Sequence, residues 1–214
     1  MAHTEFLDPY TLFWPDGVFP LGGDTLALGK FSTVKNRWRV CDLGTGSGAL
    51  LMLMARRAEG LSLTGVERSP LAAQTARENL ARNHLAGKIL TADLRNAPLP
   101  AGHFDLVISN PPYFSLGSGT SGGSARSEEH CTLTELCAAA GRLTKNGGRF
   151  ALCHRPERLS EVMCAMQNHH LEPKRLTLVS HSPAHPPSLI LVEGRKQARP
   201  GLSISCVYTH SEPL

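Results

Sequence analysis

A short apolar strand that ends at two prolines is encoded by Phe104-Asp105-Leu106-Val107-Ile108-Ser109-Asn110-Pro111-Pro112-Tyr113-Phe114. Its first half is rich in aliphatic and β-branched residues, which is typical of a buried parallel strand. Neither proline has an amide hydrogen for a further ladder bond, so the strand is predicted to end at Ser109–Asn110. In an open α/β sheet, ligands bind at the carboxyl ends of the strands. The stretch predicts either a binding-site turn that presents Asn110 and two aromatic rings, or a structural turn that buries both rings.

A glycine-rich turn upstream favours the binding site. The predicted strand 39–43 contains Asp42 and runs through Gly44-Thr45-Gly46-Ser47-Gly48 into an apolar helix, 49–55. Glycines let the backbone approach a ligand closely, and the start of a helix offers unpaired amides. The Gly-x-Gly-x-Gly spacing differs from the Gly-x-Gly-x-x-Gly of dinucleotide-binding proteins, so the turn by itself is weak evidence for a ligand.

Acids at the ends of the next two predicted strands strengthen this interpretation. Strand 62–66 is followed by Glu67, and strand 88–92 is followed by Asp93. In a Rossmann-like fold, the acid about 20 residues beyond the glycines binds the ribose hydroxyls of the ligand. Three acids in register with one glycine turn favour a shared ligand site over separate roles as helix caps or loop residues.

Predicted strands alternate with predicted helices along the rest of the chain, which indicates an α/β fold. We expect a Rossmann-like, doubly wound, mostly parallel sheet with an antiparallel C-terminal edge strand. Residues 1–23 are predicted to be an N-terminal extension packed on the core, and residues 24–214 a single domain. The Gly/Ser-rich segment 115–127 is predicted to be either a flexible substrate-contact loop or a disordered insertion. The other predicted helices are 26–31 with Asp24 as N-cap, 70–83, 128–144 and 156–169, and the other predicted strands are 149–154, 177–180, 188–193 and 202–209.

The composition of the chain bears on its cellular location and on metal binding. The chain has 214 residues and a formal net charge of +4. It has no apolar run of about 18 residues and no basic segment leading into an apolar one, so neither a membrane span nor a secretory signal is expected. Six scattered cysteines without a Cys-x-x-Cys pair indicate reduced thiols and a cytoplasmic protein. His181 and His185 are separated by Pro183, which argues against a helical metal face, and no metal is expected.

Two basic clusters are visible in the sequence. Arg195, Lys196 and Arg199 have no acid between them, and a second cluster precedes the strand 39–43. Such clusters are either phosphate contacts or ordinary solvated surface. The second cluster consists of Lys30, Lys35, Arg37 and Arg39.

Taken together, these motifs resemble the class I S-adenosylmethionine-dependent methyltransferases, over roughly residues 24 to 210. Within that class, Asn110-Pro111-Pro112-Tyr113 resembles the motif of enzymes that methylate amino groups of adenine, guanine or glutamine side chains. The chain is most similar to the family of tRNA(Val) (adenine-37-N6)-methyltransferases, which also has an element like Gly23-Asp24-Thr25. The family commonly has Arg-x-Glu or Arg-His-Glu after the motif, where this chain reads Arg126-Ser127-Glu128-Glu129-His130.

The resemblance implies roles for individual residues. The cofactor is S-adenosyl-L-methionine and the substrate is RNA, most simply tRNA. The backbone of the glycine turn would approach the methionine part, Asp42 and Asp24 its ammonium group, Glu67 the ribose and Asp93 the adenine amine. The implied catalytic residues are Asn110, Pro111, Pro112 and Tyr113; the cofactor-binding residues are Asp24, Asp42, Gly44, Thr45, Gly46, Gly48, Glu67, Arg68, Asp93, Leu94 and Asn110; the substrate-binding residues are Tyr113, Phe114 and Arg126.

Several alternatives stay open on the sequence. A protein glutamine-amide methyltransferase shares the tetrapeptide but usually has an N-terminal helical recognition domain, and only about 30 residues precede the core here. An rRNA guanine-N2 methyltransferase fits as well, because the tetrapeptide does not specify the base. A cofactor- or RNA-binding module without activity is the non-enzyme alternative, although it would not need an acceptor motif beside the cofactor acids.

Overall fold

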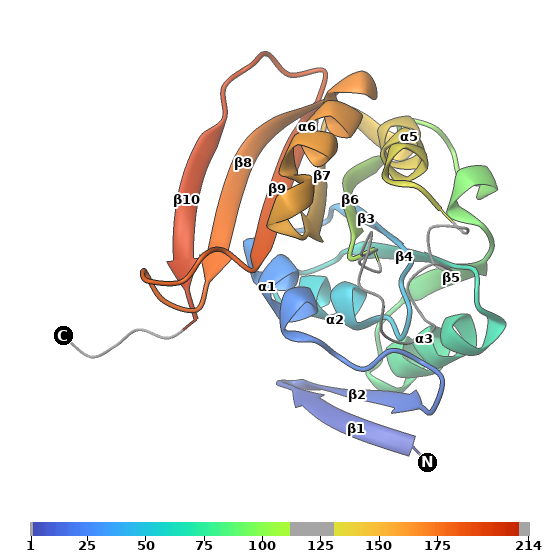
Figure 1. Cartoon of the computed structure of the whole chain (residues 1–214). Coiled ribbons are helices and arrows are strands. Elements are labelled where there is room, and N and C mark those ends of the chain that lie inside the picture. Colours follow the sequence, from blue (N-terminus) through green and yellow to red (C-terminus); the bar gives the residue numbers. More distant parts are fainter. Residues whose placement is uncertain (1, 112–130, 210–214) are drawn as a thin grey trace.

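The computed structural model describes residues 2–111 and 131–209, and eight strands of this part of the chain form one sheet (Figure 1). Their order across the sheet is β10-β8-β9-β7-β6-β3-β4-β5. The strands are β3 (Arg39–Leu43), β4 (Ser62–Glu67), β5 (Gly87–Thr91), β6 (Phe104–Ser109), β7 (Thr144–His154), β8 (Leu171–Ser180), β9 (Leu189–Lys196) and β10 (Ser203–Tyr208). The helices are α1 (Gly23–Phe31), α2 (Ala49–Ala55), α3 (Pro70–Arg82), α5 (Leu133–Leu143) and α6 (Leu159–Asn168), with short 3-10 turns η1 (Leu94–Asn96) and η2 (Pro156–Arg158).

The sheet is mostly parallel, which confirms the predicted fold class. Strands β5, β4, β3, β6 and β7 pair in parallel, whereas β9 is antiparallel to both β7 and β8. The antiparallel strand near the C-terminal edge is therefore β9, and β10 adds to the outer side of β8 in parallel. This order follows from the connections. A short turn folds β9 back on β8, and the chain then crosses the start of β8 and reverses again to form β10.

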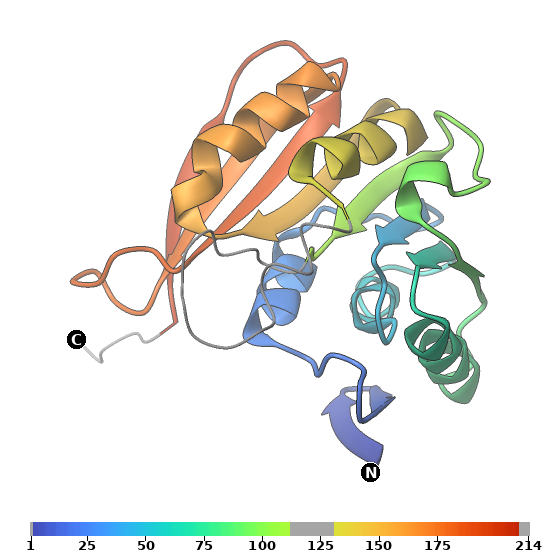
Figure 2. The same cartoon turned by 45° about the vertical axis from the view of Figure 1, so that its right-hand side comes forward.

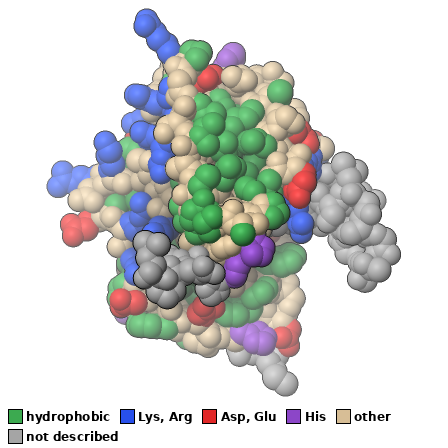
Figure 3. Space-filling model, turned by 60° about the vertical axis from the view of Figure 1, so that its left-hand side comes forward, with side chains coloured by type: hydrophobic (Ala, Val, Ile, Leu, Met, Phe, Trp, Pro, Cys, Tyr) green, Lys and Arg blue, Asp and Glu red, His purple; other side chains and the backbone are tan. Residues whose placement is uncertain are grey.

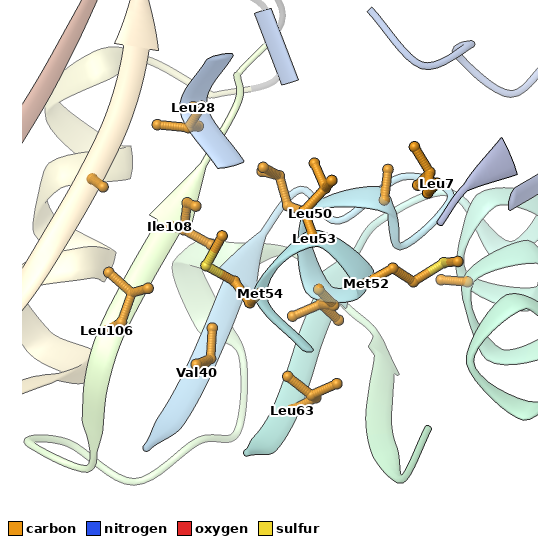
Figure 4. Packing of buried hydrophobic residues seen from close by; sticks show 14 of the residues in the cluster. Leu7, Leu28, Val40, Leu50, Met52, Leu53, Met54, Leu63, Leu106 and Ile108 are labelled. Carbon is orange, nitrogen blue, oxygen red and sulfur yellow. The ribbon is translucent and has the colours of Figure 1, made fainter. Parts of the chain in front are cut away.

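Helices cover both faces of the sheet and define two apolar cores (Figure 2). Helices α1, α2 and α3 contribute Leu28, Met52, Met54, Ala76 and other residues to a core with Val40, Leu106 and Ile108 (Figure 4). Helices α5 and α6 cover the opposite face with Cys41, Val107 and Phe150. Alternate residues of β3 and β6 thus face opposite layers, as expected of central strands that are buried on both sides.

The N-terminal segment is more regular than its sequence pattern predicts. Residues 2–15 form an antiparallel hairpin of β1 (Ala2–Leu7) and β2 (Tyr10–Pro15), where we predicted an extension without assigning strands to it. Leu7 and Leu12 are buried in the first core. The two strands were not predicted because proline and glycine residues flank them closely, and these residues are typical of turns.

Several predicted boundaries are wrong. The first helix begins at Gly23 and not Leu26, so Asp24 lies in its first turn, where a carboxylate also favours the helix dipole, and not at its N-cap. The helix expected from residue 128 begins at Leu133, where Thr132 and Glu135 form a capping box. The helix expected from residue 156 begins as the turn η2, and α6 starts at Leu159.

Strands β7 and β8 start five and six residues earlier than predicted, at Thr144 and Leu171. The residues added to β7 are polar or glycine, and those added to β8 mix polar residues with Leu171, Pro173 and Leu176; their strand conformation comes from pairing with β6 and β9. Pro173 is accommodated at a register shift in β8. Among the helices that the structure describes, none is both long and apolar enough to cross a membrane.

Candidate active site

Asp42 lies at the centre of the candidate site, buried at the end of β3. Its Oδ2 accepts a 2.7 Å hydrogen bond from the Thr45 hydroxyl. Its Oδ1 is buried and has no partner among the described residues. Burial, and secondarily the negative charge of Glu67, raise the pKa of Asp42 to about 7, although the Thr45 hydrogen bond opposes the rise. A buried acceptor without a partner is costly, so this atom is suited to a ligand's ammonium or hydroxyl group.

The glycine turn leaves room beside Asp42. Gly44 and Gly46 have φ angles of +77° and +54°, and a Cβ built on either would meet nothing within 4 Å. The turn is anchored by hydrogen bonds from the Gly44 and Thr45 amides to the Val66 carbonyl at 2.8 and 3.0 Å. A ligand can therefore approach this backbone closely, as the glycine pattern predicts.

Glu67 joins the turn to β4. Its Oε2 accepts from the Gly46 amide at 2.9 Å and its Oε1 from the Ser69 amide at 2.8 Å. These bonds fix the carboxylate in place, and each oxygen retains a further lone pair for a hydroxyl donor. The prediction that Glu67 and the glycine turn share one site is therefore consistent with the geometry.

Asp93 is more strongly paired than the sequence predicts. It caps η1, and it accepts hydrogen bonds from the Arg95 side chain at 3.0 and 2.6 Å. Arg95 also pairs with Glu135 of α5 at 3.3 Å. The Arg95 hydrogen bonds and the more distant Arg68 charge lower the pKa of Asp93. Asp93 therefore stays ionised as an acceptor, and Leu94 beside it packs against the second core.

The amide of Asn110 is held from two sides at the end of β6. Its Nδ2 donates to the Thr25 hydroxyl of α1 at 2.8 Å, and its Oδ1 accepts from the Cys153 thiol of β7 at 3.0 Å. The preceding residue, Ser109, donates to the Leu43 carbonyl at 2.7 Å and ties β6 to the end of β3. Three elements thus fix the position of Asn110 beside the Asp42 region.

The structure brings most of the predicted residues to the same end of the sheet. Asp42 and Glu67 lie at the ends of β3 and β4, Asn110 follows the neighbouring strand β6, and Asp24 lies next to Thr25 in the helix that contacts Asn110. Gly48 begins α2 in the left-handed conformation. Pro111 is the last described residue of the motif. Pro112, Tyr113, Phe114, Arg126 and the segment 115–127 lie outside the described residues, so the expectations for them stay predictions.

Two contacts of the site were missed by the sequence analysis. Cys153 was interpreted only as one of six reduced thiols, and Thr25 only as part of a family element. Both reach Asn110 through tertiary packing, at separations of 43 and 85 residues. The sequence could have placed Cys153 near the site by its position, because it lies one residue before the end of β7.

Comparison with known proteins identifies the family. The methyltransferase small domain family matches residues 22–169, which include α1, the glycine turn, β6 and β7. The chain belongs to this family. The methyltransferase small domain match also covers every described residue of the candidate site.

Several curated relatives of this chain carry the same name. A tRNA1(Val) (adenine(37)-N6)-methyltransferase of Porphyromonas gingivalis is 32% identical over 163 residues, which are 72% of this chain and 64% of the relative. A protein of the same name from Parabacteroides distasonis is 28% identical over 200 residues, which are 90% of this chain and 84% of the relative. The chain thus spans less than two thirds of the length of the Porphyromonas gingivalis protein.

Solved structures share the fold. A predicted O-methyltransferase, protein Atu636 from Agrobacterium tumefaciens, has a TM-score of 0.73 and 27% identity, covering 87% of this chain and 88% of that one. A T. thermophilus 16S rRNA N2 G1207 methyltransferase in complex with AdoMet and guanosine has a TM-score of 0.67 and 20% identity, covering 92% of this chain and 50% of that one. The latter likeness shows the methyltransferase fold alone.

Proposed function

We propose that this protein is an S-adenosylmethionine-dependent methyltransferase that modifies the exocyclic amino group of an RNA base, N6 of adenine-37 in a tRNA anticodon loop. The observation that carries the proposal is the amide of Asn110, held by Thr25 and Cys153 at the carboxyl end of β6, next to the buried acid of β3. The names of the curated relatives support the choice of adenine and tRNA.

The residues at the ends of β3 and β4 fit the cofactor. Asp42 Oδ1 is a buried acceptor without a partner among the described residues, and would accept from the cofactor's ammonium group, with Asp24 nearby in α1. The open backbone at Gly44 and Gly46 would take the methionine part, and Glu67 the ribose hydroxyls. Thr45, Gly48, Arg68, Asp93 and Leu94 complete the proposed cofactor-binding set. When bound, S-adenosylmethionine supplies an electrophilic methyl group on a sulfonium.

Asn110 and Pro111 would prepare the acceptor nitrogen. An exocyclic amino nitrogen is a poor nucleophile because its lone pair is delocalised into the ring. If Asn110 Oδ1 and the Pro111 carbonyl each accept one N–H, the nitrogen becomes more pyramidal and its lone pair is directed toward the sulfonium methyl group. The amine becomes acidic only after its nitrogen has formed the bond to the methyl carbon, so no strong base is needed. Because misplacement of the nucleophile by about 1 Å is costly, a rigid amide is an advantage.

The remaining motif residues complete the proposal. Tyr113 and Phe114 would stack on the base, which is worth roughly 1–3 kcal/mol per base, and Arg126 would contact the RNA. Pro112 would keep the motif backbone extended. We place the enzyme in the cytoplasm, with one catalytic domain over residues 24–214 and the N-terminal segment packed on it. The burial of Leu7 and Leu12 in the first core supports this division.

The test is methyl transfer from labelled S-adenosylmethionine to total tRNA that lacks the modification. The wild type should transfer label, and Asn110→Ala should abolish transfer while the cofactor dissociation constant stays within about twofold, since the acids and the glycine turn proposed to hold most of the cofactor are untouched. Asn168→Ala, an exposed change at the end of α6, is the matched control and should keep full activity. Full activity of Asn110→Ala would overturn the mechanism, and label found only in protein would favour the glutamine-amide alternative.

A further inference from the structure

The late basic cluster of the sequence surrounds a cavity in the fold. Arg195 and Lys196 end β9, Arg199 lies in the turn that follows, and Lys174 comes from the start of β8. Together with Asn146, Gly147 and the residues between Lys196 and Pro200, they line a cavity of about 410 Å³. The cavity is thus framed by three cationic side chains of one segment and one from a neighbouring strand.

The cations of this cavity are held by main-chain carbonyls. Arg195 Nε donates to the Gly147 carbonyl at 3.0 Å, Lys196 Nζ to Thr144 at 2.9 Å and Lys174 Nζ to Arg199 at 3.1 Å. Among the described residues, none of these three side chains, nor that of Arg199, pairs with a carboxylate. Carbonyl bonds orient the cations but leave their charge uncompensated.

Other cations at this end of the sheet differ in this respect. Glu193 is fully buried and pairs with Arg149 at 2.7 Å and Arg175 at 3.3 Å. Asp105 pairs with Arg39 at 3.2 Å and with Lys145. These carboxylates compensate Arg149, Arg175, Arg39 and Lys145, whereas no carboxylate of the described residues pairs with the four cations of the cavity.

The backbone around the cavity is shaped for it. Gly147 has a φ of +74°, and a Cβ built there would meet the Arg195 guanidinium at 3.3 Å, so the glycine makes room for that side chain. Gln197 has a φ of +54°, which is uncommon for a residue with a side chain. Its backbone amide donates a hydrogen bond to the backbone carbonyl of His170 at 2.9 Å. These contacts fix the conformation of the turn, and the side chains of Arg195 at the end of β9 and Arg199 in the turn are both exposed.

The cavity lies at the end of the sheet opposite the candidate active site. Arg195 lies opposite Arg149, the sixth of the eleven residues of β7, and Gly147 lies two residues closer to the start of the strand, whereas Cys153 near the end of β7 contacts Asn110. From Gly147 to Cys153 the chain covers about 20 Å along the strand. On the side of the molecule where β10 lies, Lys and Arg side chains gather along one flank of the face, beside a broad apolar area (Figure 3).

We propose that this cavity binds backbone phosphates of the RNA substrate at a distance from the methylated base. The identity of the ligand as RNA rests on the proposed function. Four uncompensated cations in one concave site match a phosphate-bearing chain, because such contacts release counterions and act independently of base sequence. A separation of about 20 Å corresponds to roughly seven base-pair steps of an A-form RNA duplex, so the contact would fall on the stem that carries the target loop.

The test compares the salt dependence of tRNA binding in single-charge variants. Arg199→Ala and Lys196→Ala should each weaken tRNA binding about 3- to 10-fold at moderate salt and reduce the slope of log affinity against log salt by about one. Lys88→Ala removes one exposed charge from β5 at the other edge of the sheet and is the matched control. It should leave both quantities unchanged.

A shortened RNA separates this inference from the proposed function. Methyl transfer to a hairpin with the same loop on a stem of about four base pairs should be equal in the wild type and in Arg199→Ala, because such a stem does not reach the cavity. An unchanged salt slope in both cavity variants, with the wild type active on tRNA, would overturn the inference alone. A second outcome would overturn the proposed function as well. It is that tRNA affinity does not depend on salt concentration in the wild type or the variants, and that no RNA is methylated.

Discussion

At the scale of single residues, the site depends on the orientation of one side-chain amide. Asn110 can act as proposed only if Oδ1, and not Nδ2, faces the acceptor nitrogen. The Thr25 hydroxyl at 2.8 Å engages Nδ2 and the Cys153 thiol at 3.0 Å engages Oδ1, so the two contacts together favour one orientation. Thr25 and Cys153 are therefore positioning residues that act through Asn110.

Thr25→Val should reduce kcat about tenfold while leaving the affinities for cofactor and tRNA nearly unchanged. The substitution keeps the shape of the side chain and removes the acceptor of Asn110 Nδ2, and a hydrogen bond of this kind is worth about 0.5–1.5 kcal/mol. Single-turnover methyl transfer measures the effect. Thr25→Ser keeps the hydroxyl and should retain wild-type kcat; wild-type kcat in Thr25→Val would contradict the positioning role.

Asp42 makes cofactor binding depend on pH. Because its pKa is raised to about 7, the carboxyl is largely protonated at pH 6 and ionised at pH 8 in the free protein. The ionised form is the one that attracts the ammonium group, so affinity should rise between pH 6 and pH 8. Calorimetric titration at the two pH values measures this rise, and Asp42→Asn should bind more weakly and lose the Asp42-dependent part of it.

The same residue should destabilise the free protein at high pH. The pKa of Asp42 is higher in the folded protein than the ordinary value of 3.8, so its stabilising contribution is complete below pH 4 and is lost as pH rises through 7. At pH 8, Asp42→Asn should raise the free energy of unfolding by up to about 4 kcal/mol. Denaturant unfolding at pH 5 and pH 8 checks the sign. A larger gain at pH 5 than at pH 8 would be inconsistent with this account.

At the scale of elements, Asn79 in α3 and Asn83 directly after it hold the N-terminal hairpin. Asn79 exchanges hydrogen bonds with the backbone of Phe13 at 2.9 and 2.7 Å, and Asn83 does so with Thr11 at 2.8 and 2.9 Å. Asn79 also donates to the Ser47 carbonyl of the glycine turn at 2.8 Å. The two side-chain amides form the hydrogen bonds to the β2 backbone that a neighbouring strand would otherwise form. Asn79 also links the hairpin to the candidate site.

Asn79→Ala should destabilise the fold by about 2–4 kcal/mol, because it leaves the Phe13 amide and two carbonyls without their partner. It should also weaken cofactor binding, since the Ser47 carbonyl in the glycine turn loses its contact. Denaturant unfolding and calorimetry give the two quantities. Gln74→Ala, an exposed change in the same helix, should change neither. A stable Asn79→Ala protein with normal cofactor affinity would rule out this link.

At the scale of the whole molecule, local sequence predicted the central elements well. The boundaries of β3, α2 and β6 agree with their predicted ranges because each is a mainly apolar run bounded by turn or loop residues. The early parts of β7 and β8 were missed because their strand conformation is imposed by pairing with distant strands. The N-terminal hairpin was missed for the same reason, because cross-strand pairing and the side chains of Asn79 and Asn83 stabilise its two strands.

The candidate site was predictable to a similar extent. Acids at strand ends and the Asn110 motif follow from local pattern and strand order, and the structure brings Asp42, Glu67 and Asn110 to one end of the sheet. The contacts of Asn110 with Thr25 and Cys153 depend on how α1 and β7 pack, which one sequence does not reveal. The cavity around Arg195 required the fold as well, because Lys174 and Gly147 come from other strands.

The central claim is that the acceptor is an exocyclic amino group of an RNA base. The most direct measurement is mass spectrometry of the nucleosides released from unmodified tRNA after incubation with the protein and S-adenosylmethionine. We predict N6-methyladenosine, mapped to position 37, and its absence with Asn110→Ala. A ring-methylated or ribose-methylated nucleoside, or no methylated nucleoside with the wild type, would contradict the account.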